Sequence, residues 1–151
     1  MMNVIGAVIA GIFGTLAMSL VMAMAPSMGL PKMDIVGMLG SMLQSDSNRP
    51  LGWGIHLMMG IIFALIYAIL WSIGIGAATL LWGLVFGAVH WLGAGLMMGG
   101  VPAMHAGVKA GTVQAPGVFM LNTGGSMAFM GGLIGHLVFG LVVALVYGLF
   151  A

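Results

Sequence analysis

The residues of this chain whose type and spacing best fit chemistry are two histidines in a repeated pattern. The two copies read Gly52-x3-His56-x3-Gly60-x3-Ala64-x2-Tyr67-Ala68 and Gly132-x3-His136-x3-Gly140-x3-Ala144-x2-Tyr147-Gly148. Both copies lie in long apolar runs. Neutral imidazole binds Zn, Cu or Fe, and histidines on two facing helices can hold haem from either side. The pattern predicts either a cofactor site at His56 and His136 or a device for packing helices.

Two further histidines extend this candidate site. His90 lies toward the end of a third apolar run, and His105 lies in the connection that follows it. In a helical hairpin arrangement all four fall in the same half of the molecule, so His56, His90, His105 and His136 are the candidate metal ligands. The alternative is that the repeated histidines hydrogen-bond across the bundle to carbonyls or hydroxyls, as polar groups in membrane helices do. We expect no bound cofactor, with haem, another tetrapyrrole or copper as the alternatives.

Copper is an alternative because the chain has 17 methionines and no cysteine. Thioether sulfur is a suitable ligand for Cu(I). However, methionine is also a flexible filler of irregular apolar contacts, and no Met-x-x-Met pattern is repeated near one end of the spans. The spacing therefore favours packing over copper.

Small residues recur at every fourth position along the apolar runs. Such rows let helix backbones approach closely. The predicted helix-contact positions are Gly52, Gly60, Ala64, Gly83, Gly87, Gly95, Gly99, Gly132, Gly140 and Ala144. Their partners could be internal or in another subunit. Tyr67 and Tyr147 fall roughly 16 Å beyond their histidines along a helix, so we expect them near the opposite interface and away from those histidines.

The composition is that of an integral membrane protein. The chain is 62% hydrophobic and 3% charged, whereas about a quarter of the residues of a soluble domain are charged. The net charge of +1 gives no indication of nucleic-acid binding. Glutamate is absent, and Asp34 and Asp46 are the only acidic side chains. Hydrolytic acid–base chemistry therefore lacks its usual parts, and we expect no enzyme.

Four runs are long enough to cross a bilayer, which takes about 20 apolar residues. We predict spans at 3–25, 51–73, 76–98 and 126–150, joined by long loops at 26–50 and 99–125 and by one tight turn. Every charged side chain falls in the two long loops. The excess of Lys and Arg there places these loops in the cytoplasm and both termini outside.

The order of motifs indicates a duplication. Ile12-Phe13-Gly14 in the first span is echoed by Val85-Phe86-Gly87 in the third, and the histidine pattern pairs the second span with the fourth. We predict a single all-α membrane domain, 1–151, which is a four-helix bundle built as a tandem repeat of two helical hairpins. In the long loop before the second span, residues 34–44 form a short amphipathic stretch, with Asp34 as its N-cap.

These motifs resemble a family of small bacterial four-helix membrane proteins classed as a domain of unknown function. The matching segments are Gly11-x2-Gly14-Thr15, Met33-Asp34-Ile35 with Met38-Leu39, Gly52-Trp53-Gly54-Ile55-His56, Gly83-x2-Phe86-Gly87 with Trp91, and His136-Leu137-Val138-Phe139-Gly140. The resemblance covers nearly the whole chain and implies a fold and a bacterial inner membrane, but no activity. His90 departs from the family pattern, which has an apolar residue at that place.

These expectations define three hypotheses for the function. The first is a non-catalytic accessory or assembly subunit of a larger membrane complex, whose partners are the lipid bilayer and either other subunits or further copies of itself. The second is a haem-, tetrapyrrole- or metal-binding membrane module that uses His56 and His136. The third is a small-solute transporter whose two halves are the repeat.

Overall fold

The computed structural model describes residues 2–150, which contain helices and no β-strand. The helices are α1 Val4–Met24, η1 Ala25–Met28, α2 Ile35–Gly40, α3 Arg49–Ser72, α4 Leu80–Met97, η2 Met98–Gly100, α5 Val101–Met104, α6 Ala106–Lys109, η3 Val118–Met120 and α7 Leu121–Gly148. Four helical segments are long and apolar enough to cross a membrane: Val4–Met28, Arg49–Ser72, Leu80–Met104 and Val118–Gly148. The predicted all-α fold with four long apolar helices is confirmed.

Glycines set two of the helix boundaries. Helix α4 starts at Leu80 and not at residue 76, because Gly74 and Gly76 turn the chain with φ of 88° and 82°. Helix α7 starts at Leu121 but is broken at Gly125, which has φ 57° and ψ −152°. That combination is open essentially only to glycine. Regular helix therefore resumes at the residue predicted to begin the fourth span.

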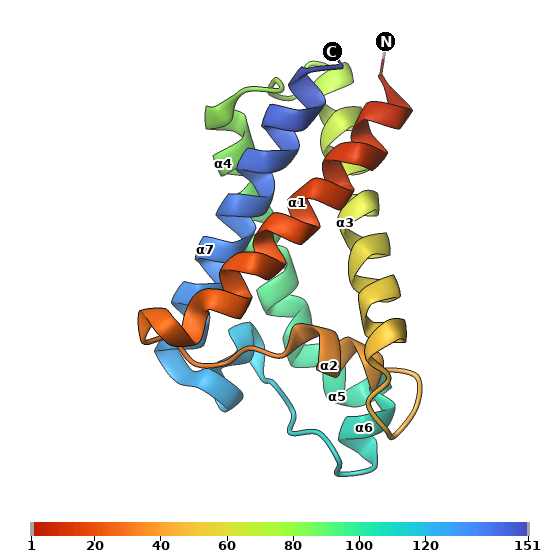
Figure 1. Cartoon of the computed structure of the whole chain (residues 1–151), viewed down its shortest axis with the longest axis vertical. Coiled ribbons are helices and arrows are strands. Elements are labelled where there is room, and N and C mark those ends of the chain that lie inside the picture. Colours follow the sequence, from red (N-terminus) through yellow and green to blue (C-terminus); the bar gives the residue numbers. More distant parts are fainter. Residues whose placement is uncertain (1, 151) are drawn as a thin grey trace. The chain divides into compact units, whose positions relative to one another are not determined.

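The chain folds into two compact units, which are described separately. Unit 1 comprises 2–21, 57–91 and 133–150 among the described residues, and unit 2 comprises 22–56 and 92–132. In unit 1, the start of α1 and the end of α7 lie together (Figure 1). Asn3 joins them, because its backbone N–H donates to the Tyr147 hydroxyl at 3.1 Å.

The helices of unit 1 touch where small residues occur. A Cβ added at Gly11 would lie 2.7 Å from the Ile61 Cα, which joins α1 to α3, and one added at Gly83 would lie 2.6 Å from the Gly140 carbonyl oxygen, which joins α4 to α7. At Gly60 the added Cβ would overlap the Thr15 hydroxyl. The small-residue faces at these positions are therefore occupied by contacts inside the chain itself.

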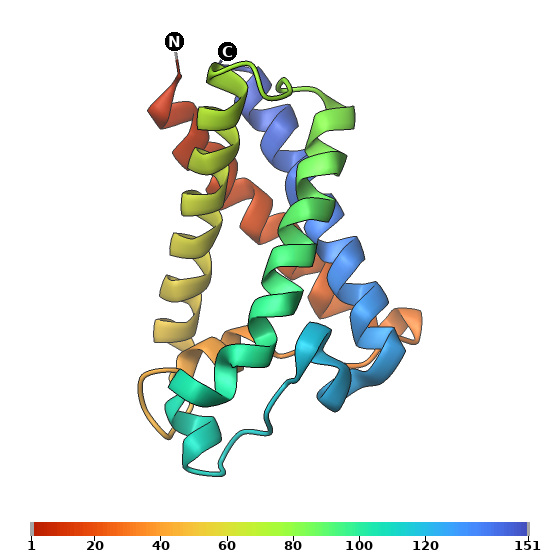
Figure 2. The ribbon, with the colours of Figure 1, turned by 180° about the vertical axis from the view of Figure 1, so that it is seen from behind.

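Aromatic rings fill the space between α3, α4 and α7 in unit 1. Tyr67 is 3% exposed, and its ring centre lies 5.0 Å from that of Phe86 and 6.0 Å from that of Phe139. Figure 2 shows α3 and α4 descending side by side from the turn that joins them. The core of unit 1 is thus a set of interlocked rings from three helices.

Unit 2 is held together differently, by hydrogen bonds between loops. The Gly107 N–H donates to the Ser41 carbonyl at 3.0 Å, and the Ala106 N–H donates to the Met42 carbonyl at 3.0 Å. The Thr112 hydroxyl donates to the Ser45 carbonyl at 2.7 Å. These bonds fix the end of α2 against α6 and the loop that follows it, so the irregular parts of unit 2 have a defined arrangement.

The predicted cap at Asp34 is confirmed, since its carboxylate accepts the Gly37 N–H at 2.9 Å. The helix that follows is shorter than the predicted stretch, because α2 ends at Gly40. The Ser41 hydroxyl then donates to the Met38 carbonyl at 3.0 Å. This bond occupies an acceptor that a further turn of helix would need.

Candidate functional site

Two of the candidate histidines approach each other in unit 1, where both are half-buried. The ring centres of His90 (α4) and His136 (α7) are 4.7 Å apart, and their planes are nearly perpendicular. His90 also stacks on Phe63 at 3.6 Å, and its Nδ1 lies 3.4 Å from the Tyr67 hydroxyl. The partner of Tyr67 is thus the histidine of another helix. Tyr67 is buried between the helices of its unit and lies against His90, not against His56 of its own helix.

The separation of the two rings limits what they could bind together. An imidazole nitrogen binds a metal at about 2.0–2.1 Å, and the ring centre lies roughly 1 Å further out, so ligands on opposite sides of one ion place their ring centres roughly 6 Å apart. The observed 4.7 Å between His90 and His136 is shorter and fits adjacent positions on one ion. A haem does not fit between these two rings.

The other two histidines belong to unit 2. His56 is 8% exposed and lies beside Trp53, with 6.2 Å between ring centres. His105 is 2% exposed, and both of its ring nitrogens are used. The Val108 N–H donates to its Nδ1 at 3.1 Å, so the proton is on Nε2, which donates to the Met38 carbonyl at 2.8 Å. The His105 side chain therefore caps the start of α6 and ties it to α2. Metal binding at either ring nitrogen would break the hydrogen bond to Val108 or the one to Met38.

The structure thus divides the four predicted ligands, with His90 and His136 in one unit and His56 and His105 in the other. Among residues 2–150, no group of three or more His, Asp or Glu side chains is placed to hold one metal ion. Within the described residues, one metal ion could therefore be held by no more than two imidazole or carboxylate side chains.

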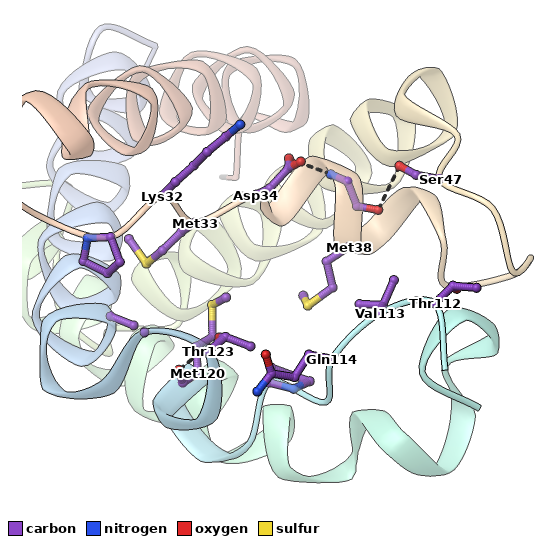
Figure 3. A pocket seen from close by; sticks show the side chains of 15 residues that line it. Lys32, Met33, Asp34, Met38, Ser47, Thr112, Val113, Gln114, Met120 and Thr123 are labelled. Carbon is purple, nitrogen blue, oxygen red and sulfur yellow. Dashed lines mark hydrogen bonds between the residues drawn. The ribbon is translucent and has the colours of Figure 1, made fainter. Parts of the chain in front are cut away.

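A cavity of about 320 Å³ lies within unit 2. One wall is the extended segment before α2 together with α2 itself, and the other is the loop before η3 together with the first turns of α7 (Figure 3). Its lining is Pro31, Lys32, Met33, Asp34, Gly37, Met38, Ser47, Thr112, Val113, Gln114, Pro116, Met120, Thr123, Gly124 and Ala128. The cavity thus joins the predicted long loops to the broken start of the last span.

The charged groups at this cavity are engaged or point away from it. The Arg49 guanidinium donates to Asp34 at 2.9 Å. Partial burial raises the pKa of the Asp34 carboxyl, but the Gly37 N–H and the guanidinium outweigh that effect, and its pKa lies below the ordinary value. In Figure 3, Lys32 and Met33 leave their segment on opposite sides. The lining also includes uncharged polar side chains, those of Ser47, Thr112, Gln114 and Thr123.

The wall formed by η3 has an unusual backbone. Phe119 and Met120 have φ of 52° and 59°, a region that costs about 1–3 kcal/mol for residues other than glycine. The Phe119 ring is held against Phe129, with 5.1 Å between ring centres, and against Gly95, where an added Cβ would overlap it. This packing holds Met120 in its conformation at the cavity wall.

Fold and site together define a class: a small all-helical protein with four membrane-length helices, a half-buried histidine pair in one unit and a cavity in the other. Comparison with models of protein families, with curated proteins and with solved structures finds no match to the chain. The resemblance to the bacterial family of unknown function therefore stays a prediction.

Sequence reasoning missed the cavity, whereas it named His90 and His136 as two of four candidate ligands, without singling them out as a pair. The available signal for the cavity was the Asp34 cap, which places Met33 just before a short helix and Met38 within it. Nothing in the sequence ties Met120 to them, because that contact depends on how the second long loop folds back.

Proposed function

We propose that this chain is a non-catalytic accessory or assembly subunit of a larger complex in a bacterial inner membrane. In this proposal the four long helices span the bilayer, the long loops face the cytoplasm, and the chain is a duplicated pair of helical hairpins. The basic residues Lys32, Arg49 and Lys109 in the long loops support that orientation. The glycine contacts on paired helices support the duplication, since Gly60 and Gly140 occupy the same place in the repeated pattern.

The observation that carries the proposal is a row of exposed isoleucines along α3 that continues into the turn directly after it. Ile62, Ile66, Ile69 and Ile73 are 46%, 41%, 46% and 65% exposed. Their spacing of four, three and four residues is that of a helix seam in which knobs enter holes on a facing helix. The close approaches of the α3 glycines are made inside the chain, Gly60 to Thr15 in unit 1 and Gly52 to Val36 in unit 2. In this proposal the outer isoleucine row packs against a transmembrane helix of another subunit.

Alanine substitution of this row tests the proposal. We expect the wild-type protein, taken from its native membranes in mild detergent, to migrate on a native gel in a complex of defined composition. The double variant Ile66→Ala/Ile69→Ala should migrate as the free protein. Val89→Ala on α4, where the side chain is 62% exposed, is the matched control and should keep the complex. Wild-type protein that is free in native membranes at its natural level would contradict the proposal.

A second function is favoured by the approach of His90 and His136. Two imidazoles 4.7 Å apart supply adjacent ligands to one Zn or Cu ion in an apolar setting. In this hypothesis the protein binds a metal ion through His90 and His136. The alternative to be tested beside it is a haem or another tetrapyrrole bound by His56 and His136.

Metal analysis and an absorption spectrum of protein purified without chelator separate these hypotheses. One equivalent of Zn or Cu that is lost in His90→Phe but kept in His56→Phe supports the ion at the pair. A Soret band lost in both His56→Phe and His136→Phe supports the haem. Protein with neither metal nor pigment, isolated from membranes supplied with both, removes this second function.

A further inference from the structure

The buried side chain of His105 joins two segments of unit 2 that are far apart in the chain. It is 2% exposed. The Val108 N–H donates to its Nδ1 at 3.1 Å, and its Nε2–H donates to the Met38 carbonyl at 2.8 Å. A donor thus faces one ring nitrogen and an acceptor faces the other. Only the neutral imidazole with its proton on Nε2 satisfies both partners.

The imidazole is enclosed by the contact between the end of α2 and the start of α6, here called the α2–α6 contact. Across it, the Gly107 N–H donates to the Ser41 carbonyl and the Ala106 N–H donates to the Met42 carbonyl, each at 3.0 Å. A Cβ added at Gly107 would lie 3.1 Å from the Ser41 Cβ and 3.3 Å from the His105 Cε1. The two segments and the ring therefore pack tightly, and the ring is a part of the contact that it closes.

A second proton on the ring would oppose this arrangement. It would turn Nδ1 from an acceptor into a donor, so that two N–H groups, those of His105 and Val108, would face each other. It would also place a positive charge where almost no solvent reaches, which is costly without a charged partner. An imidazole that meets water takes up a second proton below about pH 6.5. Acid therefore favours an open α2–α6 contact, because the open form binds the proton without these losses.

The charged side chains around the contact do not offset the added charge. Among residues 2–150, His105 has no carboxylate partner. Asp34, at the start of α2, is paired with Arg49, and its pKa lies below the ordinary value, so it stays charged above about pH 4. Asp46, in the loop after α2, is exposed to solvent. Lys109, one turn beyond His105 in α6, adds a positive charge and so disfavours a second one.

We propose that the α2–α6 contact is pH-sensitive, with neutral His105 favouring the closed form and protonated His105 favouring the open form. Gly37 and Met38 of α2 and Thr112 and Val113 after α6 all line the cavity of unit 2, so opening would separate two parts of its lining. The proposal uses neither the isoleucines of α3 nor the histidines of unit 1. Its failure would leave the subunit role and the metal hypothesis untouched.

Hydrogen exchange of backbone amides, followed by NMR on the full-length protein in detergent, tests the proposal. The reporters are the amides of Ala106, Gly107 and Val108, which are bonded in the closed contact. After correction for the intrinsic pH dependence of exchange, their opening should rise about tenfold between about pH 7.5 and 5.5, the result for uptake of one proton. The Leu30 amide, bonded to the Ala25 carbonyl at 3.0 Å in the same unit, should show no such rise. No rise at the reporters, or an equal rise at Leu30, would overturn the proposal.

A variant without a titrating side chain assigns the effect. In His105→Asn the amide oxygen can still accept a backbone N–H at the start of α6, and we expect the corrected exchange of the reporters to be independent of pH. His56→Asn is the matched control, because His56 is also buried in unit 2, with 8% exposed. It should keep the tenfold rise. A wild-type response in His105→Asn, or a lost response in His56→Asn, would overturn the assignment to His105.

A second measurement needs no variant to fold. In wild-type protein labelled with ¹⁵N at the histidine rings, the chemical shifts of the two ring nitrogens show which of them carries a proton. We expect the His105 ring to carry its proton on Nε2, with Nδ1 unprotonated, at every pH where the amides of Ala106, Gly107 and Val108 stay protected. A proton on Nδ1 while these amides stay protected would overturn the proposal, because the closed contact would then accept it.

Discussion

Units 1 and 2 are each held together by a different kind of interaction. Unit 1 contains no Asp, Glu, Lys or Arg, and its helices meet at glycines and interlocked rings. Unit 2 contains all five of these charged residues and most of the methionines, and its loops are tied by caps and backbone hydrogen bonds. The cavity of about 320 Å³ lies in unit 2, between segments held by these bonds.

The largest expected effect comes from breaking the close approach in unit 1. In Gly140→Val, the new side chain would overlap the Gly83 carbonyl, and helices α4 and α7 would have to separate. We expect a loss of about 3 kcal/mol or more in the free energy of unfolding, or no folded protein, measured by thermal or denaturant unfolding in detergent. Gly93→Ala is the control, because a Cβ there meets nothing within 4 Å. Equal stability of the two variants would refute the contact.

A smaller loss of stability is expected from a substitution at Gly95, a glycine of unit 2. In Gly95→Ala the new methyl group meets the edge of the Phe119 ring, which can move only if the strained η3 backbone moves as well. We expect a loss of about 1–3 kcal/mol in the free energy of unfolding. Phe119→Ala should remove most of the additional penalty of Gly95→Ala, so a double-mutant cycle should show coupling between the two sites. Strictly additive losses would mean that the ring does not rest on Gly95.

The smallest expected effect on stability comes from the ion pair between Asp34 and Arg49 in unit 2. Because the pKa of Asp34 in the folded protein lies below its ordinary value, the stabilisation is complete above about pH 4 and is lost as the pH falls through the folded-state pKa. The ion pair is exposed to solvent and is worth only about 0.2–1 kcal/mol. Asp34→Asn should therefore lower the melting temperature slightly at pH 6, and the difference from the wild type should shrink as the pH falls below about 4. Asp46→Asn should keep the wild-type pH dependence, and an unchanged Asp34→Asn profile would count against the pair.

The sequence predicted the parts of the fold that depend on local chemistry. Runs of apolar residues gave the four helices to within a few residues, and the Asp34 cap followed from the preference of carboxylates for the first turn of a helix. The glycine positions were identified as contact faces, but whether their partners were internal was open. The contacts between Gly83 and Gly140 and between Gly11 and Ile61 answer this for unit 1.

The candidate site was less predictable. Four histidines could be counted and ordered along the chain, but their distribution over two units could not be inferred from spacing. The role of His105 in particular depends on two hydrogen bonds, to Met38 and Val108, that form only once α2 and α6 are neighbours.

The sequence alone determined that this protein is helical and has four segments of membrane-spanning length, because hydrophobicity and helix length are properties of contiguous residues. The tertiary structure alone decided which polar groups and sulfur atoms share a space. The approach of His90 to His136, and the cavity that Met33, Met38 and Met120 line together, join residues far apart in the chain. Such long-range contacts depend on how side chains pack and how the chain turns between helices. A pattern within one segment of the sequence does not specify either.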